Sequence, residues 1–261
     1  MSTTALAAPI RVNHPGVHAR PGLARLVAVE LRKMVDTRAG FWLQVSMVAL
    51  TVVVVVVRLL VGDAADHTFQ SVLDAGLQPS AVVLPVLGIL LVTSEWFQRT
   101  GMITFALVPV RSRVLGAKLI ASIVLSLATL VMSVAVVAAG VLVASPGLDG
   151  TWSDAATLIG QSAIFLTTGM VVGVAFGAVL LASAPAVVAL SALPIAWTAA
   201  ASLSFFAGAA PWLDTRLALA PLHQEVLSPT QWAHAGTALA AWMLLPLVIG
   251  IWRITRQEVA S

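Results

Sequence analysis

The residues that most often carry chemistry in proteins are few in this chain. Its 261 residues include 5 histidines and no cysteine, which excludes a thiol nucleophile and a thiolate metal site. His14 and His18 have the spacing of a helical metal-ligand pair, but Pro15 between them opposes a helix. No G-x-x-x-x-G-K-[ST] run is present to cradle a nucleotide's phosphates. The sequence therefore predicts a protein that is not an enzyme, with no catalytic residue, metal site or cofactor of its own.

Polar side chains within long apolar segments form a second group of candidates. They are Gln161, Thr167, Thr168, Ser191 and Ser202. Such side chains bond one membrane helix to another, at about 0.6 kcal/mol each, or they line a pathway for a substrate. The sequence leaves both interpretations open.

Three glycines at intervals of four residues form a further pattern. Gly169, Gly173 and Gly177 share one face of a helix, and this spacing lets the backbone of a second helix approach closely. The pattern predicts tight helix packing, with the partner helix either in this chain or in another.

The elements that position these residues must be surrounded by lipid. Hydrophobic residues make up 59% of the chain and charged residues 10%, and the mean hydropathy is +1.00. A soluble domain carries about 25% charged residues, which this chain cannot match. The net charge is only +3, and the cations flank apolar runs, which argues against nucleic-acid binding.

Six segments are long and apolar enough to cross a bilayer, since a spanning helix needs about 20 apolar residues. The sequence therefore predicts an all-α integral membrane protein with a six-span domain over residues 39–253. The expected spans are residues 41–62, 80–98, 115–145, 155–182, 186–208 and 233–252.

The distribution of cations predicts the orientation. All 14 Lys and Arg residues except Arg58 and Arg216 fall on the side that holds both termini. Because cationic loops resist translocation, that side is expected to be cytoplasmic, and the protein is expected in the plasma membrane. Arg58 lies near the outer end of its span, where its side chain can snorkel to the surface or pair with Asp63 or a substrate.

The segment before the first span predicts a helix along the inner membrane surface. Residues 1–21 are interpreted as a mobile cytoplasmic tail and residues 254–261 as a second one. Over residues 22–38, cations and Asp36 lie opposite an apolar face, a pattern typical of an amphipathic interfacial helix that meets lipid head groups or a protein partner. The apolar face comprises Leu23, Leu26, Val27, Leu31 and Met34.

The middles of the expected spans contain no Asp, Glu, Lys or His. Ion-coupled transporters need such groups or broken helices at mid-depth, so a secondary transporter is disfavoured. If the chain uses energy, another subunit must supply it.

The connection between the second and third spans carries a distinctive pattern. The second span ends in Glu95, which precedes Arg99 by the four residues that suit a helical ion pair. Thr100 and Gly101 follow. The pattern continues through Pro109, Arg111, Arg113 and Lys118.

This arrangement resembles the membrane subunits of ABC exporters of the type-2 permease family, as found in actinobacterial drug and lipid exporters. Their second span ends in an "E-W-x-x-x-T" element that leads into "P-x-R-x-x-x-x-x-K", and an "E-L-x-K" element precedes the first span. The corresponding positions here are Glu95, Trp96, Thr100, Pro109, Arg111 and, shifted slightly, Lys118, with Glu30, Leu31 and Lys33 before the first span.

The resemblance implies a coupling helix between spans two and three that sits on a separate ATPase, which binds ATP and Mg²⁺. It also implies a second permease copy or paralogue, so that a homodimer and a heterodimer both remain open. By resemblance, the ATPase-coupling residues are Glu95, Arg99, Thr100, Gly101, Arg111 and Arg113, and the interfacial helix contributes Glu30, Arg32 and Lys33.

The chain departs from the family pattern in one place. The connection after span four, residues 183–185, carries no charge, which argues against a second coupling contact. The expected function is export of a drug, lipid or peptide. For the segment itself, the alternative is an ordinary basic inner loop. For the whole chain, the alternatives are an ATP-independent membrane anchor or scaffold and an ion-coupled secondary transporter.

Overall fold

The structure, a computed structural model, describes residues 22–62, 67–97, 111–144 and 151–256, and these residues contain helices and no strand. Six helical segments in this part of the chain are long and apolar enough to cross a membrane, which confirms the expected all-α, six-span class. They are α2 (Arg38–Val61), α3 (Phe69–Phe97), α5 (Arg111–Ala144), α6 (Ala155–Leu180), α7 (Ser183–Ala201) and the continuous run of α11 (Pro229–Leu239), η3 (Ala240–Leu244) and α12 (Leu245–Arg256).

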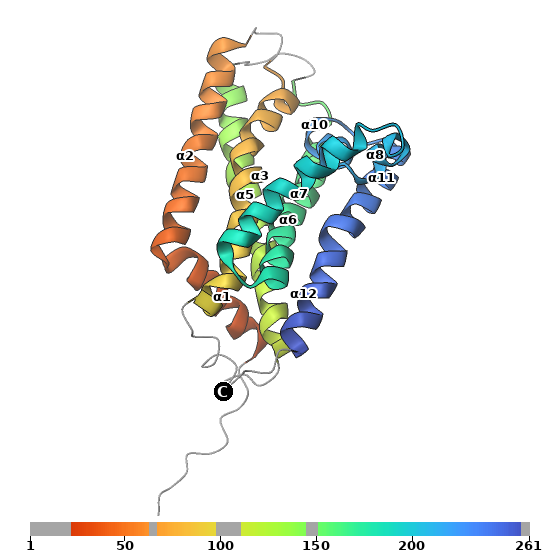
Figure 1. Cartoon of the computed structure of the whole chain (residues 1–261). Helices are drawn as coiled ribbons and strands as arrows, with labels where there is room; N and C mark the ends of the chain where they lie inside the picture. Colours follow the sequence, from red (N-terminus) through yellow and green to blue (C-terminus); the bar gives the residue numbers. More distant parts are fainter. Residues whose placement is uncertain (1–21, 63–66, 98–110, 145–150, 257–261) are drawn as a thin grey trace, which may run out of the picture.

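The remaining helices lie at the two ends of the bundle (Figure 1). Helix α1 (Leu23–Asp36) crosses the end at which α12 finishes, so residues 22 and 256 lie at the same end. The opposite end carries a series of short helices, here called the cap segment (residues 207–228). It contains η2 (Ala207–Ala209), α8 (Ala210–Leu213), α9 (Thr215–Leu219) and α10 (Pro221–Gln224).

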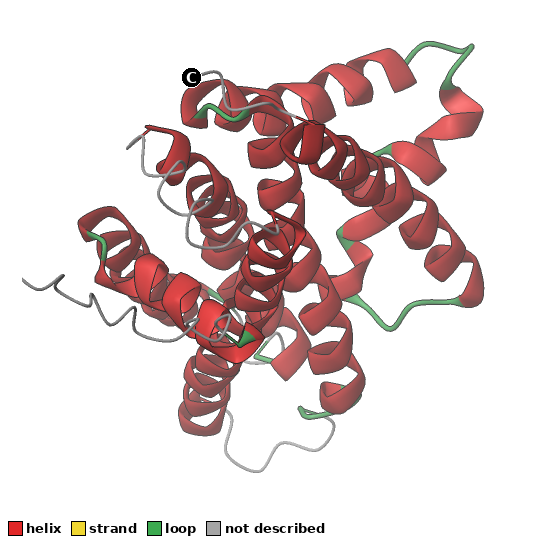
Figure 2. Ribbon diagram, turned by 90° about the horizontal axis from the view of Figure 1, so that it is seen from below, coloured by secondary structure: helices red, strands yellow, loops and turns green. Residues whose placement is uncertain are grey.

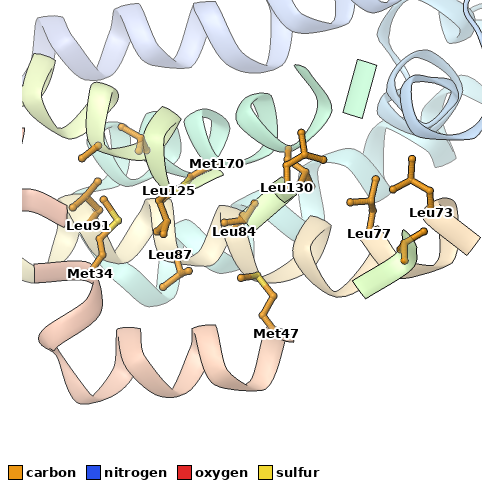
Figure 3. Packing of buried hydrophobic residues seen from close by; sticks show 14 of the residues in the cluster. Met34, Met47, Leu73, Leu77, Leu84, Leu87, Leu91, Leu125, Leu130 and Met170 are labelled. Carbon is orange, nitrogen blue, oxygen red and sulfur yellow. The ribbon is translucent and has the colours of Figure 1, made fainter. Parts of the chain in front are cut away.

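Helices α3 and α6 form the centre of the bundle and make its most extensive helix pairing. Figure 2 shows the helices from the α1 end. Helices α2, α5, α7 and α12 each contact α3 or α6. Apolar side chains spaced three, four or seven residues apart along one face of α3 lie in the centre of the core (Figure 3). They are Leu73, Leu77, Leu84, Leu87 and Leu91.

Most span boundaries lie within four residues of those expected, and the largest differences are at the start of α3 and the end of α7. Helix α3 begins at Phe69 instead of near residue 80, because the Phe69 N–H donates to the carbonyl of Thr151 at 2.9 Å and its ring packs on Trp152. Helix α7 ends at Ala201 instead of residue 208. The last run begins at Pro229 because Ser228 and Gln231 form a reciprocal capping box.

The glycine pattern of α6 packs against α3 of the same chain. A Cβ atom added to Gly173 would overlap the carbonyl of Pro85, and one added to Gly88 would overlap the carbonyl of Met170. Gly177 faces the backbone of Ile89. The two backbones are therefore in direct contact, which only glycine permits at these positions.

We expect Gly173→Ala to destabilise the protein by about 1–3 kcal/mol, the usual effect of overpacking a filled interface. Gly169→Ala is the matched control, because its Cβ would lie 3.5 Å from Pro85 Cγ, an ordinary contact. Thermal unfolding in lipid nanodiscs measures both. Equal unfolding midpoints for the two variants would contradict this account of the α3–α6 crossing.

Candidate functional site

A buried ion pair joins α1, α3 and α5 at the α1 end of the bundle. Lys118 Nζ lies 2.7 Å from Glu30 Oε2, and the two side chains are only 4% and 5% exposed. Lys118 also donates to the carbonyl of Leu91 in α3 at 2.9 Å. The second oxygen of Glu30 accepts from Lys33 at 2.8 Å. One carboxylate and one ammonium group therefore link the amino-terminal helix to two long helices.

Local sequence explains why these charges meet. Glu30 falls on the apolar face of α1, one turn before the buried Met34. Lys118 lies two turns into α5, between the buried side chains of Ala117 and Leu115 and the buried Ser122. A charge on an apolar face is costly to bury without a partner, so two opposite charges at such positions point to each other. Both residues stood out in the sequence, but their pairing did not.

The connection between α1 and α2 holds α1 in place. Thr37 separates the two helices, and its hydroxyl accepts from the N–H of Gly40 at 3.1 Å, which caps α2. Gln44 donates back to the carbonyl of Met34 at 3.1 Å. A Cβ on Gly40 would overlap that same carbonyl, so the chain turns tightly here.

The predicted coupling residues lie next to this ion pair along the chain. Arg99, Thr100 and Gly101 lie outside the described residues. Glu95 occupies the last turn of α3 and Arg111 begins α5, but the side chains of both are also outside the described part.

The other predicted residues of this region are described in full. Arg113 lies in the first turn of α5 and is half-buried. Arg32 is exposed on α1, whereas Lys33 turns toward Glu30.

Gln161, a candidate pathway residue, instead fastens the cap segment to α6. Its amide nitrogen donates to the carbonyls of Glu225 at 2.6 Å and Leu222 at 3.3 Å. Its amide oxygen accepts from the N–H of Leu227 at 3.0 Å. Gln161 is 4% exposed, and its bonds to Leu222 and Leu227 are buried.

The remaining candidate pathway residues divide into two groups. The Thr167 hydroxyl lies 3.0 Å from the Ser126 hydroxyl and so bonds α6 to α5. The exposed Ser202 donates to the carbonyl of Ala199 at the end of α7. Thr168 and Ser191, by contrast, both line one groove between α3, α6 and α7. The structure therefore brings together only these two of the five.

This groove, here called the α3/α6/α7 groove, has a volume of ≈ 470 Å³ and a mainly apolar lining. Gly169 also contributes to it. At the cap end it is bordered by Thr215 and Leu219 of α9 and by Trp242.

Polar contacts that sequence reasoning missed hold the cap segment over the bundle. Nδ1 of His223 lies 2.8 Å from Oδ1 of Asp74 in α3, and the His223 ring packs on Phe165. The hydroxyl of Thr198 in α7 donates to the buried carboxylate of Asp214 at 2.7 Å. The only sign of these contacts in the sequence is Asp74, a carboxylate near the start of an apolar helix.

A second contact at this end fixes the last membrane-crossing run. Trp242, which lies within the π-helical turn η3, donates from Nε1 to the carbonyl of Leu213 in α8 at 2.7 Å.

Arg58 of α2 donates to the hydroxyl of Ser71 at 3.0 Å, so its side chain forms a hydrogen bond within the protein.

Comparison of the sequence with protein-family profiles identified no matching family, and comparison with curated proteins identified no similar protein. Within the described ranges, no group of three or more His, Cys, Asp or Glu side chains could hold a metal ion. The site is thus defined by its ion pair, its groove and its cap contacts.

We expect Glu30→Gln to destabilise the protein by about 3–5 kcal/mol, because it removes the carboxylate that faces a buried ammonium group. Lys33→Met is the matched control. It removes a cation from the same carboxylate, but one that is 38% exposed, where an ion pair contributes about 0.2–1 kcal/mol. Unfolding in nanodiscs measures both, and a Lys33→Met effect as large as that of Glu30→Gln would contradict the central place of the buried pair.

We expect Gln161→Leu to loosen the cap segment without unfolding the bundle. The variant leaves buried backbone groups of Leu222 and Leu227 without this partner, at about 1–3 kcal/mol for each group. Hydrogen exchange of residues 222–228 should therefore accelerate. Gln78→Leu is the control, since the exposed Gln78 amide reaches Asp74 on its own helix. Unchanged exchange in Gln161→Leu would refute the fastening role.

Proposed function

We propose that this chain is the transmembrane permease subunit of an ATP-driven ABC exporter. It moves a hydrophobic or amphipathic substrate out of the cell by alternating access, and a separate ATPase subunit drives it. The six candidate spans and the motif resemblance around residues 95–118 support this proposal. The ion pair between Glu30 and Lys118 is the observation that carries it.

The position of the ion pair relative to residues 98–110 gives it mechanical meaning. Leu91 lies one turn before Glu95 in α3, and Lys118 follows Arg111 by two turns in α5. The helices entering and leaving this connection are therefore tied to each other and to α1. A push on the connection would move α1, α3 and α5 together, since a packed and bonded junction transmits displacement instead of absorbing it.

The charge distribution supports a cytoplasmic position for this end. The described cations at the α1 end outnumber those at the cap end, as expected for the inner side of a plasma membrane. Those at the cap end are Arg58 and Arg216. Both termini are accordingly assigned to the cytoplasm.

Helix α1 is assigned to the inner lipid surface. Its exposed positions combine apolar side chains with Arg25 and Arg32, a combination that suits the head-group region. The exposed apolar residues include Leu23, Val29 and Val35.

In this proposal, the separate ATPase subunit hydrolyses ATP. It binds ATP and Mg²⁺, and this chain, which lacks a phosphate-binding loop, contributes the surface on which the ATPase acts. A second permease, either another copy or a paralogue, completes the transporter. Glu95, Arg99, Thr100 and Gly101 are assigned to the contact with the ATPase.

We expect Arg99→Ala to reduce substrate-stimulated ATP hydrolysis in the assembled transporter by about 5- to 150-fold, the usual range of coupling between two sites. The measurement uses the permease reconstituted with its ATPase in proteoliposomes. Arg256→Ala is the control, because this exposed cation lies at the same end of the bundle and rests on Trp252. Unchanged hydrolysis and export in Arg99→Ala would remove the coupling role and favour an ATP-independent anchor.

A further inference from the structure

The α3/α6/α7 groove has the dimensions of a ligand site. Its ≈ 470 Å³ lies within the roughly 300–1,000 Å³ typical of small-molecule pockets. Its floor is formed by fully buried side chains, including Leu84 and Leu166. The floor is firm because α3 and α6 touch backbone to backbone beside it, at Gly173 and Pro85.

The groove opens sideways, toward the surroundings of the bundle. Val82 on its α3 rim is 69% exposed, and Ser191 on its α7 rim is also exposed. Both rims belong to helices that are apolar enough to cross a membrane. A molecule dissolved in the lipid can therefore reach the groove without passing through water.

The groove runs along the bundle. Val187 lies one turn from the start of α7 at the α1 end, and Thr215 belongs to the cap segment at the other end. Such a shape suits an elongated molecule lying parallel to the helices.

The lining determines the charge of a ligand. Among the residues that the structure describes, no Asp, Glu, Lys, Arg or His lines the groove, and the short polar side chains that line it are all hydroxyls. The hydroxyl-bearing residues are Ser80, Thr168, Ser191 and Thr215. Hydroxyls donate to and accept from ester and alcohol oxygens. A charged group would be buried there without a counter-charge, which is strongly unfavourable.

We propose that the α3/α6/α7 groove binds an uncharged, elongated neutral lipid of the diacylglycerol type, received sideways from the membrane. One of its two acyl chains packs along Leu84, Leu166 and Phe176, and the ester and hydroxyl oxygens meet the hydroxyls of Thr168 and Ser191. The inference rests on the proposed function for the export of this lipid, but not for its binding.

The test uses the purified full-length chain in phosphatidylcholine nanodiscs, without ATPase or nucleotide. One sample contains a diacylglycerol with a photoactivatable diazirine in its acyl chain. The other contains phosphatidic acid with the same chains, which differs only by its anionic phosphate. Mass spectrometry locates the adducts. We expect the neutral probe to label Ser80–Val86 and Val187–Pro194 about tenfold more than the anionic probe does.

Two variants of α7 show whether the label marks the groove. Ser191→Trp fills it and should reduce this labelling about tenfold. Val188→Trp, which places the same side chain at a position 64% exposed and outside the groove, should leave it unchanged. If either variant fails to fold, competition by excess unlabelled diacylglycerol in the unmodified chain distinguishes the same two outcomes.

Equal labelling by the two probes, or labelling of the exposed face of α2 at Val52–Val57 as strong as that of the groove, would overturn the inference. Insensitivity to Ser191→Trp and to the competitor would do the same. Because the test contains no ATPase, groove labelling would stand even if Arg99→Ala left ATP hydrolysis unchanged. Conversely, ATP-driven export without groove labelling would support the proposed function and refute the lipid-binding groove.

Discussion

The arrangement of this molecule depends on one buried charge pair. Glu30 and Lys118 are almost completely buried, and burying either charge without the other would be costly. The pair attaches α1 to the bundle at the point where α3 ends and α5 begins. An apolar contact there would allow the helices to slide, whereas an ammonium group bonded to both a carboxylate and a backbone carbonyl fixes their relative positions.

The bundle combines a rigid centre with loosely attached outer helices. In the most apolar stretches of α3 and α6, 56% of each stretch is buried inside the protein, whereas in that of α7 only 11% is buried. The backbone contact at Gly173 explains the rigidity of the centre, and the groove lies at its boundary with α7. At the cap end, Thr198 and Asp214 attach α7 to the cap segment. At the α1 end, the hydroxyls of Thr93 in α3 and Ser183 in α7 lie 2.7 Å apart, so α7 is bonded at both of its ends.

Hydropathy predicted the six membrane-crossing segments because lipid leaves an apolar run no alternative to the helix. It misplaced the start of α3, which depends on the contacts of Phe69 with Thr151 and Trp152, far along the chain. It could not pair Glu30 with Lys118, which are 88 residues apart. Helix α6 is apolar on all faces, so the sequence could not show that Thr167 faces α5 while Thr168 faces the groove. The capping box at Ser228 can be recognised in the sequence, but it precedes the apolar segment that hydropathy identifies.

A double-mutant cycle on Glu30 and Lys118 tests the central claim most directly. The free energy of unfolding in nanodiscs is measured for the unmodified chain, Glu30→Gln, Lys118→Gln and the double variant. Because the two side chains share one buried contact, the double variant should lose less stability than the single variants combined, by more than about 1 kcal/mol. Additive effects within about 0.5 kcal/mol would mean that the two residues act independently, and the junction on which this account depends would not exist.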